Sequence, residues 1–356
     1  MERQLLGRTG LEVTRIGLGG IKFGLIDQDV AIELVNVAID RGINLVDTAR
    51  GYPDSETRIG EALAGRRDQV ILSSKSPVLA ADEMRGDLEA SLEALRTDFI
   101  DIYKIHNLRL PEDYDKATGP GGALEALEKA RNEGLIGHIG ISCHRYHDTL
   151  ERAIQSGRFD VIMVAYNVLN DELMDEHIMP LAKSNNVGVL VMKPLAGGVL
   201  GAAPKSLKLQ AGESKVGIIS VKDAIRFVLA NENVDCAVVG VTCVDELEED
   251  VAAVDEAGRL SQEEISVMVE AAESFGRKFC RACGYCQPCP NGILIPIILR
   301  HLFYLKEYGL KTWAKGRYGM VEVKADNCTR CDECVERCPY DLPIPDLLEE
   351  AHERLS

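Results

Sequence analysis

Short apolar runs alternate with amphipathic stretches from residue 13 to about residue 258. The runs have the length of single strands and are almost continuously apolar, which is typical of parallel strands that are covered on both faces. They are Thr14–Leu18, Ile43–Asp47, Val70–Ser74, Ile100–Ile105, His138–Ser142, Val161–Ala165, Val187–Met192 and Cys236–Val241. The stretches between them have helical length and apolar spacing, and they include Val30–Arg41, Asp82–Leu95, Ala123–Glu133 and Asp171–Ser184.

Eight strands in alternation with helices predict an α/β protein with a (β/α)8 TIM barrel. A doubly wound open sheet would show the same alternation, but no Gly-x-Gly-x-x-Gly follows the first strand. Residues 199–219 interrupt the rhythm with small and polar residues. In a barrel they form a long loop after the seventh strand, on the face that carries the active site.

The sequence Ser261-Gln262-Glu263-Glu264 is a capping box, which marks the start of a helix. This helix leads out of the alternating region and into a stretch rich in cysteine. We therefore expect two domains, the barrel over residues 1–260 and a smaller domain over residues 261–356.

Four polar residues lie where predicted strands end. Asp47 ends the second run, Tyr52 follows in the loop, Lys75 ends the third run and His106 ends the fourth. Taken singly, each is an ordinary rim or loop residue, but in a barrel all four share one rim. Together they supply what carbonyl reduction needs: a tyrosine as proton donor, a lysine that lowers its pKa, an aspartate that holds the lysine, and a histidine that orients the carbonyl.

The net charge of −17 argues against a nucleic acid or an anionic membrane as the partner, because both are polyanions. No apolar run approaches the roughly 20 residues of a membrane span. The amino terminus also lacks the pattern of a signal peptide. We therefore expect a cytoplasmic protein that acts on a small molecule, a carbonyl compound or an alcohol.

Residues 1–258 resemble the aldo-keto reductase family. The opening segment Gly7–Gly19 is similar to the family's first hairpin and strand. The segment from Asp47 to Tyr52, followed by Ser55-Glu56, is similar to its second strand and catalytic loop, and Ser74-Lys75 and Ile105-His106 complete the match. The resemblance implies that Asp47, Tyr52, Lys75 and His106 form a catalytic tetrad.

The resemblance also implies a nicotinamide cofactor that lies across the barrel mouth. Ser142 matches the serine of a Ser-Asn pair that holds the carboxamide, and Cys143 replaces the asparagine. Met163 stands where the family has a glutamine, and Met192 stands where it has a stacking aromatic residue. The full set of expected nucleotide contacts is Gly20, Ser142, Met163, Met192, Pro194, Leu195, Gly240, Thr242, Glu246, Glu249 and Asp250.

The segment after the eighth strand, residues 240–250, matches the part of the family that grips the adenosine end. It contains five carboxylates and no basic residue. The 2′-phosphate of NADP needs Arg or Lys within reach, whereas a carboxylate suits a free ribose hydroxyl. We expect NADH over NADPH unless Lys205, Lys208 or Lys215 swings in from the preceding loop. A barrel that binds no nicotinamide is the alternative.

Eight of the eleven cysteines lie in two short motifs. Each motif places thiolates three residues apart and ends with a proline, which is typical of ferredoxins, where the fourth cysteine of each motif binds the other cluster. Structural zinc also uses Cys-x2-Cys pairs, but the duplication favours iron–sulfur. The first motif is one residue short before its last cysteine, so we expect two [4Fe–4S] clusters with one as the fallback. The expected ligands are Cys280, Cys283, Cys286, Cys289, Cys328, Cys331, Cys334 and Cys338.

Between the two motifs, Ile297–Trp313 has helical apolar spacing, which favours a small, mainly helical ferredoxin-like domain. The stretch from Arg300 to Tyr318 is basic in an otherwise acidic chain. It is either a solvated helix face or a docking patch for an acidic electron carrier such as a ferredoxin or flavodoxin. Its basic side chains after Arg300 are Lys306, Lys311, Lys315 and Arg317.

These patterns together predict an oxidoreductase that couples carbonyl and alcohol chemistry at the barrel rim to electron transfer through [4Fe–4S] clusters. Hydride chemistry moves two electrons and a cluster moves one, so a flavin, a radical intermediate or a different redox step has to divide the pair. The alternatives are a redox-sensing regulatory subunit built on a reductase fold and a barrel redox enzyme that uses no nicotinamide.

Overall fold

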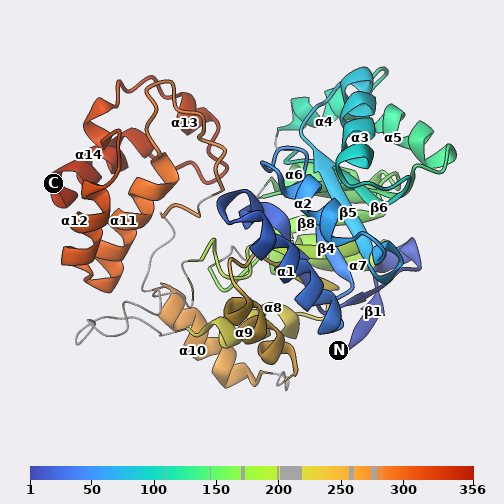
Figure 1. Ribbon diagram of the computed structural model, residues 1–356, viewed down its shortest axis with the longest axis horizontal. Coiled ribbons are helices and arrows are strands. Elements are labelled where there is room, and N and C mark those ends of the chain that lie inside the picture. The colour runs from blue at the N-terminus through green and yellow to red at the C-terminus, as the bar shows by residue number, and fades with distance from the viewer. Residues whose placement is uncertain are drawn as a thin grey trace. The chain divides into compact units, whose positions relative to one another are not determined.

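The computed structural model describes residues 1–108, 110–144, 146–169, 173–198, 200, 219–255, 260–273, 279–281 and 283–356. Its contacts divide the chain into two units (Figure 1). The first consists of Met1–Pro194 and Lys222–Leu260, and the second of Leu195–Val221 and Ser261–Ser356. We keep 1–260 and 261–356 as the proposed domain limits, although the contacts group Leu195–Val221 with the second unit.

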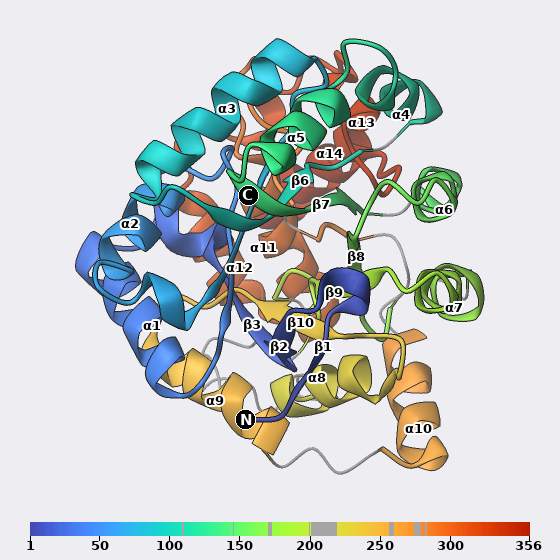
Figure 2. The same cartoon turned by 90° about the vertical axis from the view of Figure 1, so that its right-hand side faces the viewer.

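The first unit is a closed barrel of eight parallel strands, as the alternating pattern predicted (Figure 2). Neighbours follow chain order, and the last strand pairs with the first. The strands are β3 (Ile16–Gly19), β4 (Leu45–Asp47), β5 (Ile71–Ser76), β6 (Ile100–Ile105), β7 (Ile136–Cys143), β8 (Val161–Ala165), β9 (Gly188–Met192) and β10 (Cys236–Val239).

The predicted first strand, Thr14–Leu18, is in fact two strands. Glu12–Thr14 forms β2, which pairs antiparallel with β1 (Arg3–Leu5) outside the barrel, and only Ile16–Gly19 enters the barrel. Arg15 separates them, because its buried guanidinium donates hydrogen bonds to the carbonyls of Val234 and Leu229. The apolar pattern did not reveal this break, since the residues on both sides of Arg15 are buried.

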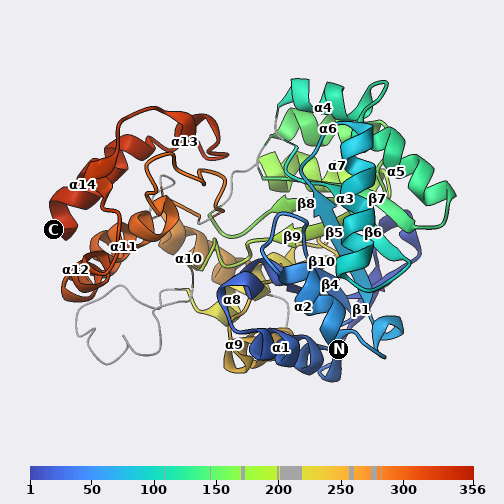
Figure 3. The same cartoon turned by 45° about the horizontal axis from the view of Figure 1, so that its top comes forward.

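Helices surround the strands (Figure 3), and each buries an apolar stripe. In α1 the buried residues recur at spacings of three and four, from Ala31 through Leu34, Val35 and Ala38 to Ile39. The helices of this unit are α1 (Gln28–Asp40), α2 (Ser55–Ala62), α3 (Ala81–Ala94), α4 (Pro111–Thr118), α5 (Ala123–Asn132), α6 (His147–Gln155), η4 (Met174–Ile178), α7 (Met179–Ser184), α8 (Val221–Ala230) and α9 (Val244–Asp255).

The described part of the second unit is mainly helical. It begins with α10 (Gln262–Glu273), where Ser261 and Glu264 form the predicted capping box through reciprocal hydrogen bonds of 3.2 and 2.7 Å. The remaining helices are α11 (Ile295–Tyr308), α12 (Lys311–Gly319), α13 (Glu333–Glu336) and α14 (Ile344–Leu355). A core that includes Ile298, Leu302 and Leu348 joins α11 to α14.

The predicted helical stretch Ile297–Trp313 covers most of α11 and the start of α12 rather than one helix. Gly309 separates the two with a φ of 65°, and its N–H donates to the carbonyl of Tyr304. Such a left-handed glycine is a common helix end.

None of the helices in the described parts of the chain has the length and apolar character that a membrane span requires.

Two glycines in the barrel helices offer a matched test of packing. An added Cβ at Gly60 in α2 would lie 2.5 Å from the carbonyl oxygen of Ala94, whereas one at Gly86 in α3 would meet no atom within 4 Å. Alanine gains about 1 kcal/mol over glycine in an open helix, but overpacking against backbone costs about 1–3 kcal/mol. We expect Gly60→Ala to lower the thermal midpoint of the protein and Gly86→Ala to raise it. Equal midpoints for the two variants would contradict the packing described here.

Candidate active site and metal centre

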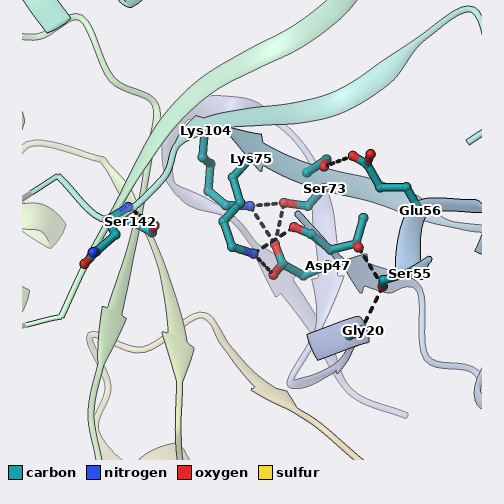
Figure 4. Close-up of polar contacts among 11 residues, drawn as sticks. Gly20, Asp47, Ser55, Glu56, Ser73, Lys75, Lys104 and Ser142 are labelled. Atoms are coloured by element: carbon teal, nitrogen blue, oxygen red, sulfur yellow. Dashed lines mark hydrogen bonds and ion pairs between the residues drawn. The ribbon is translucent and has the colours of Figure 1, made fainter. Parts of the chain in front are cut away.

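The four rim residues predicted from the sequence lie together at the carboxyl end of the strands. Asp47 ends β4, Lys75 lies in β5, His106 directly follows β6, and Tyr52 lies in the loop before α2. Lys75 is 1% exposed and its Nζ donates to Asp47 Oδ2 at 2.6 Å and to the carbonyl of Thr48 at 2.7 Å (Figure 4). The parallel strand order therefore brings the group to one rim.

Tyr52 stands between Lys75 and His106. Lys75 Nζ lies 4.9 Å from the centre of the Tyr52 ring, and the His106 ring meets the Tyr52 ring edge-on at 5.8 Å between centroids. Burial raises the pKa of Tyr52, and the charge and hydrogen bond of Lys75 lower it without offsetting the burial. The expected lowering by Lys75 is therefore present, but the net shift is upward. Tyr52 is consequently protonated at neutral pH.

The protonation states of His106, Asp47 and Lys75 suit proton donation by Tyr52. Burial lowers the pKa of His106 well below its usual value, and the charge of Lys75 adds to this. Its imidazole is therefore neutral. Burial opposes ionisation of Asp47, but Lys104 and Lys75 lower its pKa to about 2. Burial also disfavours the charge on Lys75, yet Asp47 and Tyr52 raise its pKa overall.

Lys104 belongs to this cluster, and the sequence analysis missed it. Its side chain is fully buried, and Nζ donates to Asp47 Oδ1 at 2.6 Å and contacts Ser73 Oγ (Figure 4). A signal was present in the sequence, because Lys104 lies two residues before His106 in a buried strand and so points to the same side as His106. A lysine at such a position is unusual, because lysine side chains are almost never fully buried unless a partner compensates their charge.

A second polar network braces the loop that carries Tyr52. Glu56 is buried, accepts a hydrogen bond from Ser74 Oγ at 2.6 Å and pairs with Arg50. Ser55 Oγ donates to the carbonyl of Gly20 at 2.9 Å (Figure 4). Gly20, an expected nucleotide contact, thus holds the start of α2 through its carbonyl.

The expected nicotinamide contacts on β7 to β9 occupy different environments. Ser142 is buried at the end of β7, where its hydroxyl accepts a hydrogen bond from the Asn107 N–H at 2.8 Å. Met163 lies inside the barrel in an apolar cluster, and Met192 packs against that cluster. Pro194 ends the first segment of the first unit, and Leu195 begins a segment of the second unit. The side chains of Cys143 and His144 are both buried.

The adenosine-end candidates surround the start of α9. Glu246 Oε2 accepts hydrogen bonds from the Thr242 N–H at 2.7 Å and the Thr242 hydroxyl at 3.0 Å. Gly240 precedes them, after β10, and Glu249 lies further along α9. Asp250 is only 2% exposed, and burial raises its pKa to about 8, so it is mostly protonated at neutral pH.

A lysine outside this segment also faces it. Lys22 Nζ lies 4.0 Å from Glu246 Oε2, and its charge acts on Asp250 as well. The sequence analysis missed Lys22 because it lies in the 3-10 helix Gly20–Leu25, more than 200 residues earlier in the chain. The segment is therefore less negative than its composition indicated. Lys205, Lys208 and Lys215 lie outside the described residues.

In the second unit, cysteines of the two motifs mix. One small pocket is lined by three cysteines of the first motif, Cys280, Cys283 and Cys286, and by the last cysteine of the second, Cys338. Burial raises the pKa of the Cys286 thiol, and the nearby thiols of Cys280, Cys283, Cys338 and Cys334 raise it further. Cys286 and Cys338 are buried and Cys280 and Cys283 are half-buried. Four thiolates gathered in such a place need a compensating cation, so the donor set fits an iron–sulfur cluster.

The other four cysteines form a complementary group. Burial raises the pKa of Cys334 to about 11, and its charged neighbours are Cys328, Cys331 and, from the first motif, Cys289. This grouping is consistent with the exchange of fourth cysteines that the spacing predicts, which remains a prediction. Among the described residues, no group of three or more His, Cys, Asp or Glu side chains is placed to hold a single metal ion.

Comparison with known families matches both parts of the chain. Residues 15–273 match the model of the aldo/keto reductase family, and residues 279–342 match the model of a 4Fe-4S dicluster domain.

Named relatives cover most of the barrel. L-galactose dehydrogenase of Arabidopsis thaliana is 30% identical over 74% of this chain and 91% of its own length. The NADH-specific methylglyoxal reductase of Escherichia coli is 26% identical over 78% of this chain and its full length.

Among solved structures, the holo form of an aldo-keto reductase from Bacillus halodurans superposes with a TM-score of 0.65. It is 26% identical and covers 76% of this chain and 96% of its own.

The mixed cysteine groups predict that two double cysteine variants lose different numbers of clusters. If Cys338 completes the site of Cys280, Cys283 and Cys286, the double variant Cys283→Ala/Cys338→Ala disables one site and keeps one intact cluster of about four iron atoms. Cys283→Ala/Cys289→Ala, which removes two cysteines of the first motif, should instead disable both sites. Iron and sulfide analysis with electron paramagnetic resonance after anaerobic reconstitution would distinguish them. Cys243→Ala, at an exposed cysteine of the barrel, is the control, and equal losses in both double variants would contradict the exchange.

Proposed function

The chain belongs to the aldo/keto reductase family and carries a 4Fe-4S dicluster domain, and from this premise we propose how it works as an oxidoreductase. Its barrel interconverts a carbonyl and an alcohol at Asp47, Tyr52, Lys75 and His106, and its second unit moves electrons through iron–sulfur clusters. The observation that carries the proposal is the buried Lys75, which links the Asp47 carboxylate to the Tyr52 ring at the active rim.

The chemistry of the rim follows from the protonation states of its residues. Tyr52 keeps its proton at neutral pH and can donate it to a carbonyl oxygen as the oxygen gains charge. The Lys75 ammonium stabilises the phenolate that remains, and Asp47 holds that ammonium in place. The neutral His106 imidazole beside Tyr52 can donate a hydrogen bond to the same oxygen. A nicotinamide bound across the mouth would supply the hydride.

The substrate class is a small carbonyl compound or its alcohol. Two relatives support this range, since one is named for L-galactose and the other for methylglyoxal. Both compounds are therefore rational first probes.

For the second unit, we propose that the two cysteine groups each hold one [4Fe–4S] cluster, with ligands Cys280, Cys283, Cys286 and Cys338 in one group and Cys289, Cys328, Cys331 and Cys334 in the other. The mixed grouping of the buried thiols supports this assignment. Clusters of this kind would carry single electrons to or from a ferredoxin-like or flavodoxin-like carrier.

The basic stretch of α11 and α12 gives this carrier limited support. Lys306 pairs with Glu350 at 3.0 Å, Arg300 donates to the carbonyl of Gly197 at 3.2 Å, and Lys315 bonds to the carbonyl of Ser356. Arg317 lies 5.7 Å from the Trp313 ring, and Lys306, Lys311 and Arg317 are all exposed. Exposed pairs contribute little stability, so a docking role falls on these three exposed side chains.

Tyr52→Phe tests the reductase mechanism. The variant removes the proton donor but keeps the ring that contacts His106, so we expect hydride transfer from NADH to methylglyoxal or another accepted carbonyl to slow by about 10²–10⁴-fold. Stopped-flow absorbance of the reduced nicotinamide measures this rate. Tyr103→Phe is the matched control, because it removes a buried tyrosine hydroxyl that hydrogen-bonds to Ser91 at 3.0 Å. A Tyr52→Phe enzyme as fast as this control would show that Tyr52 is not the proton donor, whereas no hydride transfer by the native protein would favour the regulatory-subunit alternative.

For the nucleotide, we propose NADH over NADPH, because Glu246 compensates Lys22 and leaves no free cation for a 2′-phosphate in the described part of the α9 segment. Calorimetric titration should show tighter binding of NADH. Glu246→Gln releases Lys22 and should shift the preference toward NADPH by up to about fivefold, since an exposed charge pair is worth about 0.2–1 kcal/mol. Glu248→Gln, on the same helix but paired with Arg41 at 2.6 Å, is the control. Tighter NADPH binding by the native protein, or no binding of either nucleotide, would refute the assignment.

A further inference from the structure

The Asp47 carboxylate is shared by two lysines. Its Oδ2 accepts from Lys75 Nζ and its Oδ1 from Lys104 Nζ, each at 2.6 Å, and all three side chains are at most 4% exposed. Ser73 adds a hydrogen bond to Oδ1 at 2.9 Å. The proposed carbonyl chemistry needs only one of these lysines, so Lys104 requires its own explanation.

The barrel makes room for the Lys104 side chain. Lys104 pairs in register with Gly140 of the neighbouring strand β7. A Cβ at Gly140 would lie 2.9 Å from Lys104 Cγ and 2.7 Å from the carbonyl oxygen of Val161. Only glycine at this position lets the lysine stem lie along the inner wall of the barrel and reach Asp47.

The charges around Lys104 do not balance. The charged groups that face it are Asp47 from β4 and Lys75 from β5, and His106, which follows β6, is neutral. Strand β7 presents Gly140 opposite it. Glu56, the other buried carboxylate of this rim, is engaged by Arg50 and Ser74. One carboxylate therefore faces two ammonium groups when both lysines are protonated.

We propose that Lys104 is a positioning residue that divides the Asp47 carboxylate with Lys75, so that part of the Lys75 charge stays uncompensated and stabilises the phenolate of Tyr52. This inference deepens the proposed function and rests on Tyr52 as the proton donor. In the reaction, the Tyr52 O–H bond breaks as the carbonyl oxygen takes the proton, and the electron pair of that bond stays on the phenolate oxygen. The uncompensated charge lowers the energy of that state.

The lysine also makes this effect dependent on pH. Burial lowers the pKa of Lys104 and the Lys75 charge lowers it further, while Asp47 raises it. The resulting pKa of Lys104 is about 8. Below this pH Lys104 is charged and shares Asp47. Above it Lys104 loses its proton, Asp47 compensates Lys75 more completely, and Tyr52 becomes a weaker acid.

The experiment measures the acidity of residue 52 directly, without substrate or nucleotide. 3,5-Difluorotyrosine is placed at position 52 in the full-length protein, because its hydroxyl is acidic enough to titrate where Lys104 still carries its proton. Fluorine NMR follows its ionisation with pH. In Lys104→Met we expect its pKa to rise by about one unit, which is a tenfold loss of acidity.

Lys104→Gln separates charge from packing. It keeps a polar group that can hydrogen-bond to Asp47 but carries no charge, so we expect the same rise as in Lys104→Met. A Lys129→Gln variant, at a lysine on the outer helix α5, should not change the titration. An unchanged pKa at position 52 in a folded Lys104→Gln protein would overturn the inference.

The two proposals can fail separately. A shift at position 52 together with full activity of Tyr52→Phe would mean that Lys104 controls the phenol but that the phenol is not the donor. An inactive Tyr52→Phe without any shift would leave the reductase mechanism in place and remove Lys104 from it.

Discussion

The ionic pair between Asp47 and Lys75 is the interaction on which the active rim depends. Burying a charge costs several kcal/mol unless a partner and hydrogen bonds compensate it. Here Asp47 meets Lys75, Lys104 and Ser73, and Lys75 also bonds to the Thr48 carbonyl. Such a pair persists only when the strands hold its members at fixed positions. The closed barrel does so, because β4, β5 and β6 are neighbours in register.

The same pair sets the properties of its surroundings. With Lys75 fixed, the Tyr52 hydroxyl has a cation beside it. Burial keeps the His106 imidazole neutral, and the positive charge of the lysines adds to this effect. The loop with Tyr52 is held from the other side by Glu56 and Ser55. Positions of the reacting groups therefore follow from buried polar contacts rather than from apolar packing alone.

The sequence predicted those features that depend on local periodicity or on strand ends. Two strands, β6 and β8, have the predicted limits, and Asp47, Lys75 and His106 fall on one rim because parallel strands end together. It missed features that depend on contacts between distant residues. Lys22 meets Glu246 across most of the chain, and Arg15 interrupts an apolar run because of carbonyls near residue 230. Net pKa shifts also escaped prediction, since burial outweighs Lys75 at Tyr52.

The proposed exchange of cysteines between the two motifs would have a consequence for the folding of the chain. A cluster bound by Cys280, Cys283, Cys286 and Cys338 would tie together segments separated by α11 and α12. Such a cross-link removes loop-closure entropy from the unfolded chain, as a disulfide does. Binding a metal group to a site that is absent from the unfolded state is also a contribution to folding free energy. Damage by oxygen to either cluster would therefore loosen both motifs at once. The fraction of protein with a folded second unit would depend on the supply of iron and sulfide.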